Sequence, residues 1–328
     1  MDPYADLFEE ITAARSRIQG MIRPTPLEHS PVLSRMTEGE VWLKLENWQV
    51  TRSFKIRGAA NKILSLSETG KNRGVVTSST GNHGIAVAHV LKKLGVPGIV
   101  FLPENTSDAK LRSIRLMETD LEFFGQDCVE AEMHARRFAG EQGKTYVSPY
   151  NDPLIVAGQG TVGLEIIGQL EATGSAVPDA VLCPVGGGGL ISGLACAFKT
   201  RYPSVEIIGC QPENSAVMAH SIKAGRILEM ESKPTLSDGT AGGIEPGSVT
   251  FSCCRKWVDR FILVPEEEIA AAVRLFLGTH HMVVEGAGAL PAAALLRGKD
   301  AWREKRVVLL ISGGRLCLDT LRTIVREN

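Results

Sequence analysis

Residues 180–198, AVLCPVGGGGLISGLACAF, decide the fold class of this 328-residue chain. The stretch is uncharged and long enough to cross a membrane, but Pro184 and the four glycines Gly186–Gly189 interrupt it. A buried strand over Ala180–Pro184, a glycine loop and a helix over residues 189–200 explain the pattern better than a membrane span. A strand that leads directly into a helix is the repeating unit of α/β proteins.

The same alternation of strand and helix extends along the whole chain. Several strands are continuously apolar, as in parallel sheets that are covered on both faces. Further strands are predicted at Val41–Leu45, Gly74–Thr77, Gly98–Leu102, Leu121–Phe124, Thr145–Val147, Glu206–Gly209, Phe261–Val264 and Arg306–Ile311. Further helices are predicted over residues 5–20, 54–66, 82–94, 107–118, 128–142, 154–172, 214–224, 266–279 and 286–297. We therefore predict an α/β protein with mostly parallel sheets. Because no Pro- or Ser-rich linker divides the chain, two domains would have to be interwoven.

The composition is that of an ordinary globular protein. Hydrophobic residues make up 44% and charged residues 22%, which excludes a disordered chain or a coiled coil. A net charge of −1 gives no basic field to attract nucleic acid or a membrane surface. The acidic N-terminal stretch is unlike a secretory signal peptide, and the seven cysteines form no CxxC pair. We therefore expect a cytoplasmic, reducing location without disulfides. Adjacent Cys253 and Cys254 are interpreted as helix residues, with a redox pair as the alternative.

The four glycines Gly186–Gly189 lie between a predicted strand and a predicted helix. There the backbone can close onto a ligand, and the N–H groups at the start of the helix suit a phosphate. The loop is not a Walker A motif, because no Lys-Ser/Thr follows, and Ile191 breaks the GxGxxG pattern of dinucleotide-binding proteins. A site for a small monophosphate remains, with a structural glycine hinge as the alternative.

A second polar cluster, Thr77–Gly84, reads TSSTGNHG and precedes an apolar helix. Free N–H groups at a helix start suit a carboxylate or phosphate. The alternative is a simple capped turn. Two weaker clusters, Ser312–Gly314 and Glu285–Gly288, also follow or precede apolar segments, and the carboxyl ends of parallel strands are where open α/β sheets bind ligands.

Lys55 lies in the segment Ser53–Gly58, SFKIRG. Ser53 is a good helix N-cap, which would place Lys55 in the first helical turn. The positive end of the helix disfavours an ammonium there and would lower the pKa of the lysine. A neutral amine is what Schiff-base chemistry needs, whereas the alternative is a solvated surface lysine.

Seven motifs occur in the order and at the spacing of one enzyme family. They are Lys44–Asn47 with Ser53–Gly58, Ser79–Gly84, Ala157–Thr161, Pro184–Leu190, Ser237–Gly239, Val284–Ala289 and Ser312–Gly314. Together they resemble the fold-type II pyridoxal-phosphate (PLP) enzymes, which are tryptophan synthase β-like in fold, and above all the threonine/serine dehydratases and serine racemases. The resemblance covers essentially the whole chain. It implies two interwoven three-layer α/β/α domains with mostly parallel sheets: a large PLP-binding domain from residues 1–70 and 150–328, and a small domain from residues 74–149 that closes over substrate.

The resemblance also implies a role for each motif. Lys55 would hold PLP as a Schiff base and then remove the α-proton of the substrate. Backbone N–H groups would grip the substrate carboxylate, and they belong to Ser79, Thr80, Gly81, Asn82 and His83. The cofactor-binding residues would be Phe54 beside the ring, Asn82 at the ring hydroxyl, Gly186, Gly187, Gly188 and Gly189 at the phosphate, Gly239, Glu285 near the ring and the reacting amine, and Ser312 at the pyridine nitrogen. A neutral hydroxyl at that nitrogen favours rapid β-elimination.

The implied activity is that of an ammonia-lyase, which converts a β-hydroxy amino acid of the threonine/serine type into a 2-oxo acid and ammonia. One alternative is a racemase with Lys55 and Thr80 on opposite faces of the ring. Others are β-replacement, as in cysteine synthases, and a non-catalytic PLP-binding protein. The segment Ser78–Gly84 also looks like a dehydratase subgroup assigned to hydroxyectoine breakdown. An acidic hydroxy amino acid such as 3-hydroxyaspartate is a further alternative for the substrate. Relatives are commonly dimers or tetramers, so we expect a homodimer or homotetramer.

Three positions depart from the family pattern. Thr80 stands where serine racemases carry a serine and simple dehydratases often an alanine, so it keeps a hydroxyl, although it is interpreted first as a residue that shapes the pocket. Racemases of this group bind a divalent cation near the strand before Gln211, but Gln211 and Val217 are uncharged here, and we expect no metal. Arg315 stands where many relatives have asparagine, and its charge could bind an acidic substrate group.

Overall fold

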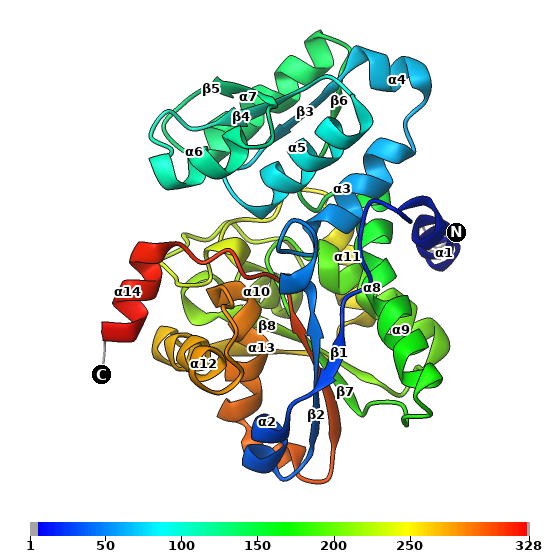
Figure 1. Ribbon diagram of the computed structural model, residues 1–328, viewed down its shortest axis with the longest axis vertical. Coiled ribbons are helices and arrows are strands. Elements are labelled where there is room, and N and C mark those ends of the chain that lie inside the picture. The colour runs from blue at the N-terminus through cyan, green and yellow to red at the C-terminus, as the bar shows by residue number, and fades with distance from the viewer. Residues whose placement is uncertain (1–5, 327–328) are drawn as a thin grey trace.

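The chain forms two separate sheets with helices on both faces, as the computed structural model of residues 6–326 shows (Figure 1). The strands are β1 Leu27–His29, β2 Glu40–Leu45, β3 Val75–Ser78, β4 Gly98–Leu102, β5 Asp120–Phe123, β6 Thr145–Tyr146, β7 Ala180–Pro184, β8 Glu206–Pro212, β9 Arg260–Val264 and β10 Arg306–Ile311. The α-helices are α1 Leu7–Arg17, α2 Pro31–Thr37, α3 Lys55–Leu64, α4 Glu68–Arg73, α5 Asn82–Leu94, α6 Asp108–Arg115, α7 Cys128–Glu141, α8 Pro153–Ala172, α9 Gly189–Arg201, α10 Val217–Ala224, α11 Val249–Trp257, α12 Glu266–Thr279, α13 Gly286–Arg297 and α14 Leu318–Arg326. Short 3-10 turns span Glu46–Trp48, Glu213–Ser215, Asp238–Thr240 and Lys299–Trp302.

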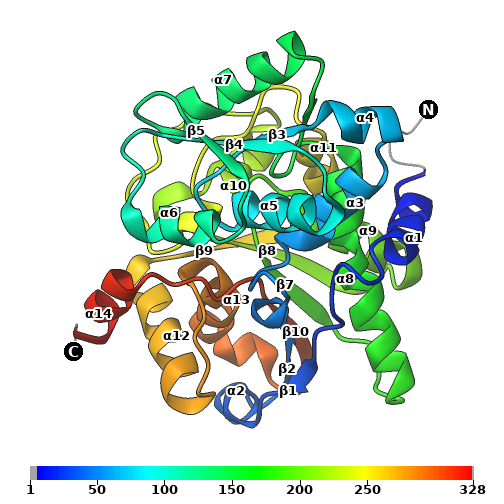
Figure 2. The same ribbon diagram turned by 45° about the horizontal axis from the view of Figure 1, so that its top comes forward.

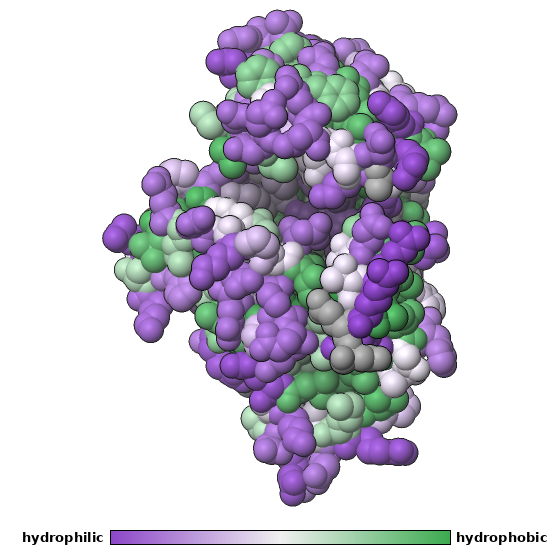
Figure 3. Space-filling model, turned by 90° about the vertical axis from the view of Figure 1, so that its left-hand side faces the viewer, coloured by the Kyte–Doolittle hydropathy of each residue, from purple (hydrophilic) through white to green (hydrophobic). Residues whose placement is uncertain are grey.

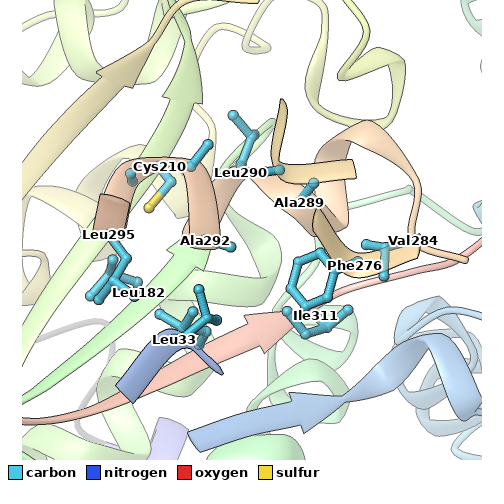
Figure 4. Packing of buried hydrophobic residues seen from close by; sticks show 14 of the residues in the cluster. Leu33, Leu182, Cys210, Phe276, Val284, Ala289, Leu290, Ala292, Leu295 and Ile311 are labelled. Carbon is cyan, nitrogen blue, oxygen red and sulfur yellow. The ribbon is translucent and has the colours of Figure 1, made fainter. Parts of the chain in front are cut away.

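The larger sheet has six strands in the order β1-β2-β10-β7-β8-β9, and only β1 runs antiparallel to its neighbour. Because side chains alternate across a strand, β10 supplies Leu309 to one core and Leu310 to the other. The first core lies under α2, α12 and α13 (Figure 4), and the second under α8, α9, α10 and α11. Both faces of this sheet are therefore buried, as the apolar runs predicted.

The smaller sheet has four parallel strands in the order β5-β4-β3-β6. Helices α5 and α6 cover one face and α7 covers the other. All four strands lie between β2 and β7 in the chain, so the polypeptide leaves the six-stranded layer, builds the four-stranded layer and returns. Figures 1 and 2 show the four-stranded layer above the six-stranded one. The α/β class and the mostly parallel sheets are confirmed, whereas the domain limits stay a prediction.

Most of the predicted elements are present, and six have the predicted bounds. These six are β4, β7, β10, α5, α12 and α13. One strand and four helices were not predicted, namely β1, α2, α4, α11 and α14. The helix predicted over residues 214–224 begins only at Val217, because a 3-10 turn precedes it. Each of the missed elements has at most nine residues, and α4 buries no side chain, so their apolar periodicity is weak.

The cysteines and the helices bear on the expected environment of the chain. All seven cysteines are free, and Cys253 and Cys254 lie on α11, as the helix interpretation predicted. None of the helices in residues 6–326 combines the length and the apolar composition that a membrane span needs.

Candidate active site

Lys55 is the first residue of α3, but the cap differs from the prediction. Phe54, not Ser53, occupies the N-cap position, and it has helical backbone angles and no side-chain cap. Ser53 instead pairs with Gly313 in an isolated β-bridge, while the N–H of Phe54 donates to the Ser312 carbonyl at 3.1 Å. The prediction of a Ser53 cap was therefore wrong. The hydroxyl of Ser53 is left buried without a hydrogen-bond partner in residues 6–326.

The amine of Lys55 is buried and makes one hydrogen bond, to a backbone carbonyl. Its Nζ donates to the carbonyl of Pro149 at 2.8 Å and lies 5.3 Å from the centre of the half-buried Phe54 ring. Burial lowers the pKa of Lys55 to about 8, and the nearby carboxylates of Glu285 and Glu132 oppose that shift. At neutral pH this amine therefore has a neutral fraction of roughly a tenth, far more than an ordinary lysine has, and the neutral form is the one that a nucleophile or base requires.

A buried charge network fixes the helix that carries Lys55. Arg57 donates from Nε and Nη2 to Glu46 at 2.8 and 2.7 Å, and from Nη2 to Glu165 at 2.9 Å. Lys44 donates to the same Glu165 at 2.6 Å. Arg57, Lys44 and Glu46 are fully buried, and the two positive charges are balanced by two carboxylates. Because each charge has a partner at close range, the network holds α3 to β2 and α8 without an uncompensated buried ion.

Asn82 and Glu285 meet across the two layers. Asn82 begins α5 of the four-stranded layer, and its Nδ2 donates to Glu285 at 2.8 Å, just before α13. The N–H of Arg315 donates to the second oxygen of Glu285 at 3.1 Å. Burial nevertheless raises the pKa of Glu285 to about 7. The Oδ1 of Asn82 is buried without a hydrogen-bond partner in residues 6–326, so one acceptor in this corner is unused.

The Ser312–Gly314 turn packs closely against the carboxylate of Glu285. A Cβ at Gly313 would lie 2.8 Å from Cδ of Glu285 and would overlap one of its oxygens, so only glycine fits there. Ser312 is almost fully buried, and residues 6–326 offer its hydroxyl no hydrogen-bond partner. Gly239 closes the other side of this corner, since a Cβ there would lie 3.3 Å from Ala287 and 3.8 Å from Glu285.

The turn Ser79–Gly81 joins β3 to α5 and is partly exposed. The Oγ of Ser79 accepts from the N–H of Gly81 at 3.2 Å. The hydroxyl of Thr80 makes no hydrogen bond within residues 6–326. His83 is buried, with Nε2 3.0 Å from the Val147 carbonyl, and burial lowers the pKa of His83 to about 3. Its imidazole is therefore neutral, so a carboxylate here would be bound by the backbone N–H groups and the helix start rather than by a cation.

The four-glycine loop ends at the start of α9 and is closed in by two elements. Gly188 has a left-handed φ of +85°, which favours glycine. A Cβ at Gly187 would lie 2.6 Å from Cδ2 of Tyr150, and one at Gly186 would lie 3.0 Å from Cα of Thr240. Within residues 6–326, the N–H groups of Gly186, Gly187 and Gly188 donate no backbone hydrogen bond. Together with the start of a 13-residue helix, they form a cradle for an anion.

These groups form one connected cluster, because each motif touches the next. Lys55 contacts Pro149, whose neighbour Tyr150 packs on the glycine loop, while Phe54 contacts Ser312. The side of the molecule in Figure 3 is hollowed between the two layers. Sequence reasoning missed three participants: the Pro149 carbonyl, the Tyr150 ring and Thr250, whose Oγ1 donates to the Gly187 carbonyl at 2.5 Å. No local pattern marks them, since their roles arise only from packing.

Gln211, at the position where related racemases bind a cation, makes hydrogen bonds to the backbone instead. Gln211 donates from Nε2 to the Val185 carbonyl at 3.0 Å, and its Oε1 accepts from the N–H of Ala219 at 2.8 Å. Val217 is buried beside it in the core. Residues 6–326 contain no group of three or more histidine, cysteine, aspartate or glutamate side chains placed to hold a metal ion.

Known proteins resemble the chain over nearly its whole length. A family model described as "Pyridoxal-phosphate dependent enzyme" matches residues 18–313. An L-threonine ammonia-lyase of Thermotoga maritima is 41% identical over 320 residues, which cover 98% of this chain and 78% of that protein. A threonine deaminase isoform of Solanum lycopersicum has a similar solved structure, with a TM-score of 0.91, 30% identity and coverage of 97% and 92%. Maize serine racemase gives a TM-score of 0.89, 31% identity and coverage of 98% and 97%.

Proposed function

The chain belongs to the pyridoxal-phosphate-dependent enzymes, and from this membership we propose that it is an ammonia-lyase acting on a β-hydroxy amino acid of the threonine/serine type. The products are a 2-oxo acid and ammonia. The ammonia-lyase and deaminase named above support this reaction class. The observation that carries the proposal is Lys55 itself, a desolvated amine with a lowered pKa that bonds to Pro149, whose neighbour Tyr150 packs on the glycine loop.

The residues present fit pyridoxal phosphate. The Gly186–Gly189 loop offers free N–H groups to a phosphate, the Tyr150 ring would clash with a Cβ at Gly187, and Thr240 would crowd one at Gly186. Asn82 has a buried acceptor without a partner, which suits the ring hydroxyl. Ser312 has an unused hydroxyl, which suits the pyridine nitrogen. We propose that these residues, with Phe54, Gly239 and Glu285 around the ring, hold the cofactor, and that Lys55 binds it covalently.

When bound, pyridoxal phosphate withdraws electrons from the α-carbon of the substrate and makes the α-proton removable. Lys55 then takes this proton at Nζ, which its lowered pKa of about 8 permits. Glu285, whose pKa is raised to about 7, keeps Asn82 oriented through its bond to Nδ2. The N–H groups from Ser79 to His83 orient the substrate carboxylate at the start of α5. Packing of the four-stranded layer over the cleft excludes water from these charges.

The reaction is tested by measuring 2-oxo acid release from purified, PLP-loaded protein. The panel contains L-threonine, L-serine, both diastereomers of 3-hydroxyaspartate, a hydroxyectoine breakdown product and the matching D-isomers. Release from one or more of them is expected and identifies the preferred side chain. Silence across the panel, with the visible absorbance of the bound cofactor intact, would contradict a lyase of this substrate class.

A racemase is the second candidate, because the Thr80 hydroxyl has no partner in residues 6–326 and lies in the turn before Asn82. Lys55 and Thr80 would then exchange the α-proton on opposite faces of the ring. Chiral analysis of recovered substrate separates the two reactions. If racemisation occurs, Thr80→Ala is expected to abolish it while 2-oxo acid release continues.

We also propose a homodimer or homotetramer in a cytoplasmic, reducing compartment. Exposed apolar side chains support self-association, among them Leu116, Val129 and Met133, each more than 60% exposed. Seven free cysteines support the reducing compartment. Light scattering coupled to size exclusion measures the oligomer, and a monomeric mass would contradict it.

A further inference from the structure

The segment Val147–Asn151 crosses from β6 back to α8 and contacts both halves of the candidate site. The hydroxyl of Thr77 and Nε2 of His83 both lie within hydrogen-bond distance of the Val147 carbonyl, at 2.8 and 3.0 Å. Two residues on, the Pro149 carbonyl accepts from Lys55. The ring of Tyr150 then packs on Gly187. This crossing segment therefore links the substrate turn, the lysine and the phosphate loop.

Glu245 anchors the far end of the crossing segment. Its backbone N–H donates to the hydroxyl of Tyr150 at 2.9 Å. Its side-chain Oε2 accepts from Nδ2 of Asn151 at 2.8 Å. Asn151 is held in turn, because its Oδ1 accepts from the N–H of Val249 at 3.0 Å. The ring of Tyr150 is thus held against the glycine loop by bonds that converge on one residue.

The other oxygen of Glu245 reaches the four-stranded layer. Arg136 of α7 donates from Nη2 to Oε1 of Glu245 at 2.6 Å, and also to Glu132 at 2.8 Å. Its guanidinium lies 4.3 Å from the centre of the Tyr146 ring. The side chains of Arg136 and Glu245 are only 35% and 25% exposed. An ion pair with this burial and a second acceptor is stronger than the ordinary surface pair.

We propose that the Arg136–Glu245 ion pair is a tether between the two layers that sets the affinity for the cofactor phosphate. The tether acts through Tyr150, which shapes the Gly186–Gly189 loop. Arg136, Glu245 and Tyr150 are thus positioning residues, and closure of the four-stranded layer strengthens cofactor binding. This inference rests on the proposed function, because it takes the glycine loop as the phosphate site.

The physical reason is that the shape of the loop depends on the residues packed against it. Its N–H groups make no backbone hydrogen bonds within residues 6–326, so their direction depends on what packs against the loop. The two packing partners of Gly187 are the Tyr150 ring and the Thr250 hydroxyl. If Arg136 releases Glu245, the bonds that hold Tyr150 weaken, and the N–H groups lose the common direction that a phosphate needs.

The test measures PLP binding rather than turnover. Apoprotein is titrated with PLP, and the dissociation constant and the rate of cofactor loss are read from the visible absorbance of the lysine-bound cofactor. The variants are Arg136→Gln, Glu245→Gln, the double variant of these two, Tyr150→Phe, and Tyr150→Phe combined with Glu245→Gln. The matched control is Arg137→Gln, because Arg137 is the next residue on α7, is 64% exposed and pairs with Glu141 only at 3.9 Å. The melting temperature of each apoprotein reports general damage.

We expect both single variants to raise the dissociation constant about threefold to tenfold, as for the loss of a partly buried ion pair. The double variant of Arg136 and Glu245 should have a dissociation constant for PLP no higher than that of the weaker-binding single variant. In protein that already carries Tyr150→Phe, Glu245→Gln should raise this constant only slightly. Arg137→Gln should bind PLP like the original protein. Equal affinities in all variants, or losses that follow the apoprotein melting temperature, would overturn the tether. Failure of the unaltered protein to bind PLP would instead overturn the proposed function.

Discussion

Replacement of Gly187 by alanine should disable cofactor binding without unfolding the protein. The new Cβ would lie 2.6 Å from Cδ2 of Tyr150, whereas carbon atoms normally pack at about 3.5–4.0 Å. The loop or the ring must therefore move by about 1 Å. A hydrogen bond of about 2.9 Å that lengthens by 1 Å is lost. Each bond to a charged group contributes about 1.5–3 kcal/mol, so the loss of one or two corresponds to a roughly 100-fold weaker PLP complex.

The assay is a PLP titration of the apoprotein, followed by absorbance, with the apoprotein melting temperature as the second measurement. Gly168→Ala is the matched control, because the same substitution on α8 meets no atom within 4 Å. It should leave PLP affinity unchanged and stabilise the helix by up to ~1 kcal/mol. If Gly187→Ala binds PLP within about twofold of the original protein, the cradle described here is not the phosphate site.

Three further predictions concern Lys55 and the buried charge network that fixes its helix. Lys55→Ala should lower 2-oxo acid release by at least ~1000-fold, since it removes both the covalent anchor and the base, and activity within tenfold of the original would contradict that role. Because burial lowers the pKa of Lys55 to about 8, its amine is neutral above that pH. The rate at which apoprotein captures PLP, followed by stopped-flow absorbance, should rise about tenfold per pH unit below 8 and then level, whereas an ordinary lysine would give a rise to about pH 10. Glu46→Gln should cost about 3–5 kcal/mol of unfolding free energy in urea titrations, because it leaves buried Arg57 under-compensated. The exposed pair of Glu171 with Arg201 provides the control, where Glu171→Gln should leave the urea unfolding midpoint almost unchanged.

The sheets could be predicted largely because their strands are buried on both faces. A short, continuously apolar run such as the one in Arg306–Ile311 indicates a strand that is buried on both faces. The predicted bounds of this strand agree with the structure to the residue. Elements that lack such a run were missed. β1 is three residues long with two exposed, and α4 rests on a Ser67 cap with no buried side chain. Their existence depends on a neighbouring strand or a cap rather than on periodicity.

The candidate site was predictable only as separate motifs until the resemblance joined them. Glycines and hydroxyls at strand ends indicated an anion site, and the segment Pro149–Tyr150 connects the glycine loop to Lys55 in the structure. The lowered pKa of Lys55 was predicted, but its main cause was not. The helix start was expected to lower it, with Ser53 as the cap, but burial is the main cause and Ser53 is not the cap. Tyr150 and Glu245 could not be predicted, because their partners lie more than thirty residues away in the chain.

The central place of β10 has a consequence for how the chain is made. β10 lies between β2 and β7, and it pairs Arg306 with Glu40 across most of the polypeptide. During synthesis, therefore, one edge of β2 stays unpaired until β10, more than 250 residues later, has left the ribosome. Such long-range pairing is slow, and open edges invite pairing with other chains. The intervening four-stranded layer pairs only strands that lie between β2 and β7 in the chain, so it can fold first. Insertion of β10 then joins two half-sheets, β1-β2 and β7-β8-β9, so the cofactor cleft can form only after Ile311 has been synthesised.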